Sequence, residues 1–142
     1  MRIGKTKLRV YQTTAIFSMI LAVFGFSYNI WRMEVTEKNN SSREACFELL
    51  LQLSELEQLV YAAHYDKNKE LGNPRNGWIK VGLIGDLSFV TELPVREKAV
   101  DLKNVWQSNW SAMEESRVAT DKIVDAIDEV RLAVRLVIAS LE

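Results

Sequence analysis

The chain is poor in the residue types that build most catalytic and metal sites. Its 142 residues include one histidine, His64, and one cysteine, Cys46. A single cysteine excludes an intramolecular disulfide and any multi-cysteine metal site, and a lone histidine cannot form an HExxH or similar zinc motif. The sequence also has no serine–histidine–acid set and no glycine-rich phosphate loop. We therefore expect no enzymatic activity, no metal and no cofactor.

Clustered positive charge is lacking beyond the first few residues. Four of the 18 basic side chains lie within the first nine residues, ahead of the first acidic residue, Glu34: Arg2, Lys5, Lys7 and Arg9. Residues 32–142 then hold 14 basic and 19 acidic side chains, a net charge of −5. Because phosphate binding needs clustered lysine and arginine, we expect no nucleic acid partner.

Charge is absent altogether from Val10 to Trp31. About 20 apolar residues, at a rise of about 1.5 Å each, span a hydrocarbon core of roughly 30 Å. Tyr11 lies at one end, and Tyr28 with Trp31 at the other, as is typical of aromatic side chains at the two membrane interfaces. We predict a membrane-spanning helix over 10–31, with the basic tail of residues 1–9 in the cytoplasm.

A cleaved signal peptide is the competing interpretation of this stretch. A basic segment followed by an apolar segment fits both an anchor and a signal peptide. The apolar run is followed by FSYNIWRM, which has no small-x-small cleavage site. We favour an uncleaved anchor.

An amphipathic helix is predicted after the anchor. Residues 32–40 are polar and have no apolar period, so we interpret them as a juxtamembrane linker. Ser41 to Glu44 fits a capping box at a helix start. Apolar residues then follow at spacings of three and four: Cys46, Leu49, Leu50, Leu53, Leu56, Val60 and Ala63. This pattern predicts a helix over 42–70, ended by Gly72 in the left-handed cap position and by Pro74.

The segment from 74 to 93 permits two structures. Asn73 can cap a helix that has Pro74 at its first position. Alternatively, residues around a Gly85-Asp86 turn can form a hairpin. We favour the helix, because a lone hairpin is marginally stable.

Two further helical patterns complete an all-α chain. Pro94 can open a third helix, and Ser111 to Glu114 is a second capping box ahead of a helix over about 112–141. The third helix has one apolar face, formed by Val95, Ala99, Leu102, Trp106 and Trp110. The last helix keeps the helical period of apolar residues through Ala119, Ile123, Ala126, Ile127, Val130, Val134, Val137, Ile138 and Leu141. The sequence leaves open whether these helices are separate or one kinked helix. We predict an antiparallel bundle of about four helices over 41–142, two long and two short. We place it outside the cytoplasm of a bacterium, anchored in the inner membrane.

The last helix carries the predicted partner-binding surface. A helix that is apolar on nearly every face needs cover on all sides, and the stretch before the C terminus has this property. A deeply buried helix end is the simpler explanation. The residues assigned to the surface are Val130, Leu132, Leu136, Val137, Ala139 and Leu141.

Other features have minor functional interpretations. Trp78, Trp106 and Trp110 form a possible ligand cleft, although aromatic residues at helical spacing are usually core. His64 could sense pH, but a partly exposed histidine at a helix end is the simpler explanation. We expect Cys46 to be a buried thiol. The acidic face of the last helix, interpreted as solvated, comprises Glu114, Asp121, Asp125 and Asp128.

Three functions fit these features. We favour a membrane-anchored interaction module that binds another protein or a second copy of itself. The alternatives are a small-ligand sensor that signals through a partner and an immunity or inhibitor protein. In layout only, a basic tail, one span and an outer helical domain resemble the sensing half of bacterial membrane receptors, although the chain has no second span.

Overall fold

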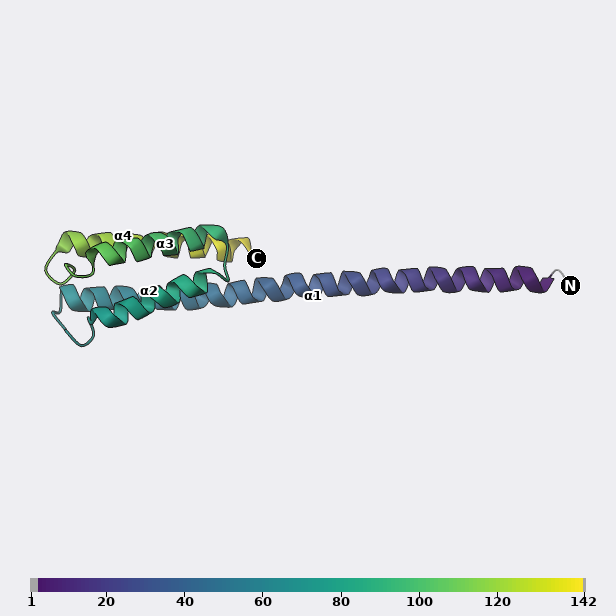
Figure 1. The fold of residues 1–142 in the computed structure, drawn as a ribbon, viewed down its shortest axis with the longest axis horizontal. Coiled ribbons are helices and arrows are strands. Elements are labelled where there is room, and N and C mark those ends of the chain that lie inside the picture. Colours follow the sequence, from purple (N-terminus) through teal and green to yellow (C-terminus); the bar gives the residue numbers. More distant parts are fainter. Residues whose placement is uncertain (1–2, 142) are drawn as a thin grey trace. The chain divides into compact units, whose positions relative to one another are not determined.

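The computed structural model describes residues 3–141, and within this range the chain is all-helical, with no β-strand (Figure 1). The helices are α1 (Ile3–His64), α2 (Pro74–Ser88), α3 (Leu93–Asn109) and α4 (Arg117–Ser140). The chain divides into two compact units, Met1–Lys38 and Asn39–Glu142. We call the second of these the helical unit. The predicted all-α class is confirmed.

In the first unit, the side chains are uncovered. Every residue from Lys7 to Lys38 is exposed, including Phe17 and Phe24 in the uncharged stretch. By length and composition, α1 is the one helix of the described residues that could cross a membrane. Of the predicted basic tail, Arg2 lies outside the described residues.

The boundary predicted at Ser41 is wrong as a helix start. Residues 32–40, predicted as a linker, are helical, and α1 runs through them without a break. The stretch contains neither proline nor glycine, so nothing in it stops a helix. An apolar period arises only where one face of a helix is buried, so its absence here indicates that no face is buried. It does not indicate that the segment is non-helical.

The helical unit has one apolar core. Its fully or nearly fully buried side chains come from all four helices and from Met113 in the turn before α4. α3 packs against both α2 and α4. The largest side chains that are fully buried are Leu49, Leu53, Leu56, Ile84, Leu102, Trp106, Met113, Ile123 and Ile127. The apolar periods predicted for α1, α3 and α4 therefore face the core.

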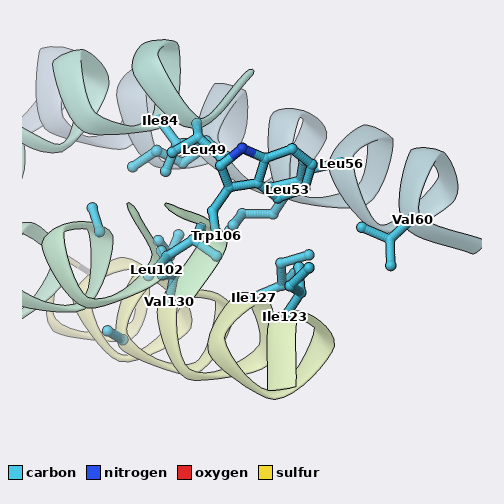
Figure 2. Close-up of a cluster of buried hydrophobic side chains, with 14 of the residues drawn as sticks. Leu49, Leu53, Leu56, Val60, Ile84, Leu102, Trp106, Ile123, Ile127 and Val130 are labelled. Atoms are coloured by element: carbon cyan, nitrogen blue, oxygen red, sulfur yellow. The ribbon is translucent and has the colours of Figure 1, made fainter. Parts of the chain in front are cut away.

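Trp106 is the largest of these buried side chains, and its indole extends from α3 toward the leucines of α1 (Figure 2). The ring packs so closely on α2 that a Cβ at Gly77 would lie 2.2 Å from its atoms. Gly77 is therefore required for close packing of α2 on α3, as expected where a backbone approaches a large side chain.

Two hydrogen bonds join α1 to the residues that flank α4. Arg43 Nη2 donates to the carbonyl oxygen of Leu141 at 2.9 Å. At the other end, His64 Nδ1 lies 2.9 Å from the carbonyl oxygen of Met113. The start of the helical unit thus lies beside the end of α4, and the end of α1 lies beside the turn that precedes α4.

α1 ends at His64, several residues before the predicted end at 70. Lys67 has the positive φ of 50° that was expected of Gly72, and the amide of Asn68 reaches back to the carbonyl of Ala62 at 2.9 Å. This hydrogen bond spans six positions, one more than the 6→1 bond of a Schellman motif, and together with the left-handed Lys67 it closes the helix. Gly72 is needed for another reason: a Cβ there would lie 2.6 Å from the backbone of Ala63.

α2 settles the choice between helix and hairpin in favour of the helix. The side chain of Asn73 accepts a hydrogen bond from the amide of Arg75 at 3.0 Å, and Pro74 occupies the first turn, as predicted. Gly82 and Gly85 have open space around them, so their cost is one of backbone entropy and not of packing.

α3 and α4 are separate helices. The predicted start of the last helix near 112 is wrong, because a turn occupies 110–115 and Ser116 is the N-cap, accepting a hydrogen bond from the amide of Ala119 at 3.3 Å. The hydroxyl of Thr120 donates to the carbonyl of Met113 at 2.8 Å and fixes the turn from within. Local hydrogen bonding at Ser116 therefore outcompetes the capping box at Ser111.

Candidate functional site

The structure divides the predicted partner-binding residues of α4 into two groups. Val130 and Val137 face the core, with exposed fractions of 0% and 6%, and Leu141 packs partly against it. Leu132 and Leu136 are exposed to 56% and 64%, and Ala139 is also exposed. The exposed group is spaced by three and four residues, so it forms one outward face at the end of α4.

Leu132 and Leu136 line an open groove between α3 and α4 with a volume of about 520 Å³. α3 contributes its first turns and α4 its last turns. The apolar lining residues are Pro94, Leu132, Ala133, Leu136 and Val137. The polar lining residues are Glu92, Glu97, Lys98, Glu129 and Ser140. We call the apolar lining residues the floor of the groove and the polar lining residues its rim.

The rim of the groove is acidic. Lys98 Nζ pairs with Glu129 Oε2 at 3.0 Å across the two helices, and the carboxylate raises the pKa of Lys98. Neither Glu92 nor Glu97 is in an ion pair within the described range. Two carboxylates beside an apolar floor thus remain available to a cationic partner.

The three tryptophans of the predicted cleft come together in the structure. Trp78 lies edge-on to both Trp106 and Trp110, with ring centroids 6.4 and 6.5 Å apart. Trp106 is completely buried, and its indole nitrogen has no hydrogen-bond partner among the described residues. Trp106 is therefore core, as the simpler sequence interpretation held.

Trp110 lines a second cleft, of about 510 Å³, at the end of the unit where α1 and α2 are connected. One carboxylate, that of Glu114, lines this cleft together with three basic side chains, Lys67, Lys69 and Arg75. Lys67 is already paired with Glu115 at 3.6 Å. Lys69 and Arg75 are in no ion pair in the described part of the chain, so they could bind an anion.

The remaining candidates have structural surroundings. The Cys46 thiol is buried on the core side of α1, and desolvation raises its pKa. On α4, Asp121 pairs with Arg117 and Asp128 pairs with Arg131, while Glu114 lies in the turn before the helix. Among the described residues, no group of histidine, cysteine and carboxylate side chains could hold a metal ion.

The residues predicted from the sequence include three that line the groove from α4, Leu132, Leu136 and Val137, and none that line it from α3. The positions 129, 132, 136 and 140 recur at helical spacing on α4, and this signal was available in the sequence. The residues of α3 that line the groove were missed. The apolar period of α3 predicts which of its faces is buried, but it does not predict which helix lies beside it. Comparison of the chain with protein families, with curated proteins and with solved structures found no match.

Proposed function

We propose that this protein is a membrane-anchored interaction module whose helical unit binds an amphipathic helix of another protein in the groove between α3 and α4. The observation that carries this proposal is the exposure of Leu132 and Leu136 on the floor of an apolar groove with an acidic rim. The fold we propose for the unit is an antiparallel four-helix bundle, with α1 and α4 as its long helices. Its location is the outer side of a bacterial inner membrane.

The uncharged stretch of α1 supports the anchor. Val10 to Trp31 is long enough to cross a bilayer, and its side chains are exposed all round. A helix of a soluble protein needs a covered face, and this stretch has none among the residues that the structure describes. Lipid would cover it, and the basic residues that precede it would stay in the cytoplasm.

The chemistry of the groove supports an amphipathic helix with basic flanks as the partner. An amphipathic helix can insert apolar side chains, spaced by three or four residues, between Leu132 and Leu136. Basic residues flanking that stripe would meet Glu92 and Glu97. Such charge complementarity adds specificity and accelerates association.

Site-specific crosslinking in native membranes tests this proposal. A photo-crosslinking amino acid replaces Leu136 in one full-length variant and Val118 in a matched control. Val118 is also an exposed apolar residue of α4, at 65%, but it does not line the groove. We expect an adduct from position 136 that maps to a helix with basic flanks, and no such adduct from position 118.

Two double variants complete the test. Because both leucines are more than half exposed, Leu132→Asp with Leu136→Asp should abolish the association and leave the circular dichroism of the unit unchanged. Glu92→Lys with Glu97→Lys should weaken the association, and added salt should reduce the difference between this variant and the native chain. Adducts only with a second copy of the chain, or adducts that persist in both variants, would overturn the proposed partner.

A ligand sensor is the second candidate, favoured by the basic cleft beside Trp110. A small carboxylate or phosphate could bind Lys69 and Arg75 there. Titration with inorganic phosphate or succinate should then change the tryptophan fluorescence of the native protein, and Lys69→Gln with Arg75→Gln should abolish the response. An unchanged spectrum at millimolar concentrations of both anions would exclude these ligands.

A further inference from the structure

The connection between α2 and α3 has two buried polar side chains and three exposed apolar ones, beside one exposed carboxylate, Glu92. Ser88 and Thr91 are buried, with exposed fractions of 1% and 8%. Phe89, Val90 and Leu93 are exposed to 65%, 53% and 59%. A connection between helices in water usually has the opposite arrangement, so the exposed apolar side chains need an explanation.

The two buried hydroxyls of this connection and three of its amides form hydrogen bonds within the chain. Ser88 Oγ donates to the carbonyl of Gly85 at 2.6 Å, and Thr91 Oγ1 donates to the carbonyl of Ser88 at 2.8 Å. The amides of residues 89, 90 and 91 donate to carbonyls three residues earlier. Because these groups already form hydrogen bonds within the chain, their removal from water costs little. The Glu92 carboxylate forms none with the described residues, so it must stay in water or among the headgroups.

Arg96 ties the connection to α3. Its guanidinium lies 4.8 Å from the centroid of the Phe89 ring, and Nη2 donates to the carbonyl of Phe89 at 3.1 Å. An aromatic ring with an adjacent guanidinium is a combination suited to the boundary between acyl chains and headgroups.

The connection lies at the end of the helical unit where the chain enters. Arg43, near the first residues of the unit, is bonded to Leu141. Within this unit, Figure 1 shows the α2–α3 connection at the same end as the C-terminal end of α4. The three exposed apolar side chains are thus at the end through which the unit is joined to the uncharged stretch.

The length of chain between the two limits how far this end can be from a bilayer. Residues 32–38 separate Trp31 from the unit. They extend about 10 Å as a helix and at most about 25 Å when fully stretched. The polar headgroup layer is itself about 5–7 Å thick on each side of the hydrocarbon core. With the span at 10–31, the helical unit therefore begins within about 25 Å of the hydrocarbon core.

Charge around the connection favours apolar insertion over electrostatic attraction. Between 86 and 98 the acidic side chains are Asp86, Glu92 and Glu97, and the basic ones are Arg96 and Lys98. This slight excess of negative charge gives no attraction to anionic lipids. Zwitterionic lipids should therefore suffice.

We propose that Phe89, Val90 and Leu93 insert into the interface of the bilayer that holds the anchor and so dock the helical unit on the membrane surface. This inference rests on the proposed membrane span over 10–31. Insertion would hold the groove, whose rim begins at Glu92, close to the membrane, where a partner helix leaving the same bilayer would approach it.

Fluorescence quenching by lipid-attached nitroxides tests the docking. The full chain with Cys46→Ser receives one new cysteine, Val90→Cys or Leu71→Cys, and each is labelled with an environment-sensitive fluorophore. Leu71 is a matched control, because it is exposed to 60% in the connection at the other end of the unit. The proteins are reconstituted in phosphatidylcholine vesicles that carry a nitroxide at a shallow acyl position.

We expect the label at position 90 to emit at shorter wavelength and to be strongly quenched, while the label at position 71 behaves as in water. Unchanged emission from position 90, in protein that floats with the vesicles and resists an alkaline wash, would overturn the docking and leave the anchor intact. A blue shift without quenching would also overturn it, because a second copy would then cover the site. Failure to float with vesicles would overturn the anchor and the docking together.

Discussion

Two stretches of α1 show how the same secondary structure serves different surroundings. From 10 to 31 the helix is apolar and every side chain is exposed, whereas from 42 to 64 apolar side chains at spacings of three and four are buried. Backbone geometry does not distinguish them. What differs is the surface that covers the apolar side chains: three other helices in the second stretch and, in our proposal, lipid in the first.

Charges introduced into the uncharged stretch should have the largest effect. Leu21→Arg with Phe24→Arg would place two cations near the middle of the proposed span, at about 2.5–3.5 kcal/mol each on insertion scales. We expect the chain to leave the membrane fraction after an alkaline wash. The matched control is Phe47→Arg with Leu51→Arg, at exposed positions of the same helix in the helical unit, which should remain in the membrane fraction.

Truncation of a buried leucine should have the second-largest effect, a loss of folding stability. Leu53→Ala removes a completely buried side chain and should lower the free energy of unfolding by about 2–5 kcal/mol. Leu51→Ala, two residues away and 51% exposed, should change it by less than about 0.5 kcal/mol. Urea unfolding followed by circular dichroism measures the free energy of unfolding of both variants. Equal losses would contradict the burial of Leu53 and the exposure of Leu51.

Addition of a single methyl group at two glycines of α2 should have the smallest effect. Gly77 is covered by another side chain, whereas Gly82 faces open space. Gly77→Ala would press a methyl group onto Trp106 and should destabilise the unit by about 1–3 kcal/mol. Gly82→Ala faces open space within a helix and should stabilise it by about 0.5–1 kcal/mol. Thermal unfolding of the two variants should shift in opposite directions, and shifts of the same sign would contradict the packing of Trp106 on α2.

The sequence predicted the buried faces better than the helix boundaries. The periods around Leu53, Trp106 and Ile127 were identified because burial imposes a spacing on apolar residues. The ends of α1 and α4 were misplaced because they depend on hydrogen bonds at Asn68 and Ser116, which compete with equally suitable signals at Gly72 and Ser111. Such competition is resolved by tertiary packing and cannot be decided locally.

The candidate site was only half predictable for a related reason. Leu132 and Leu136 were identified as apolar residues beyond the core stripe of α4. The groove also needs Pro94 and Glu97 of α3, whose position opposite α4 follows from the packing of the helices. The exposed Phe89 and Val90 were missed because an apolar run in a sequence carries no sign of which members are buried.

Cysteine accessibility along α1 tests the central claim most directly. In the full chain with Cys46→Ser, single cysteines from position 10 to position 38 are exposed in native membranes to a membrane-impermeant maleimide, with Leu51→Cys as the reactive control. Our account predicts an unbroken block of protected positions within 10–31 and reactive positions beyond it. Reactivity that recurs every three or four residues through that block would mean that protein covers one face of the stretch, and uniform reactivity would mean that water does; either result would contradict a membrane span.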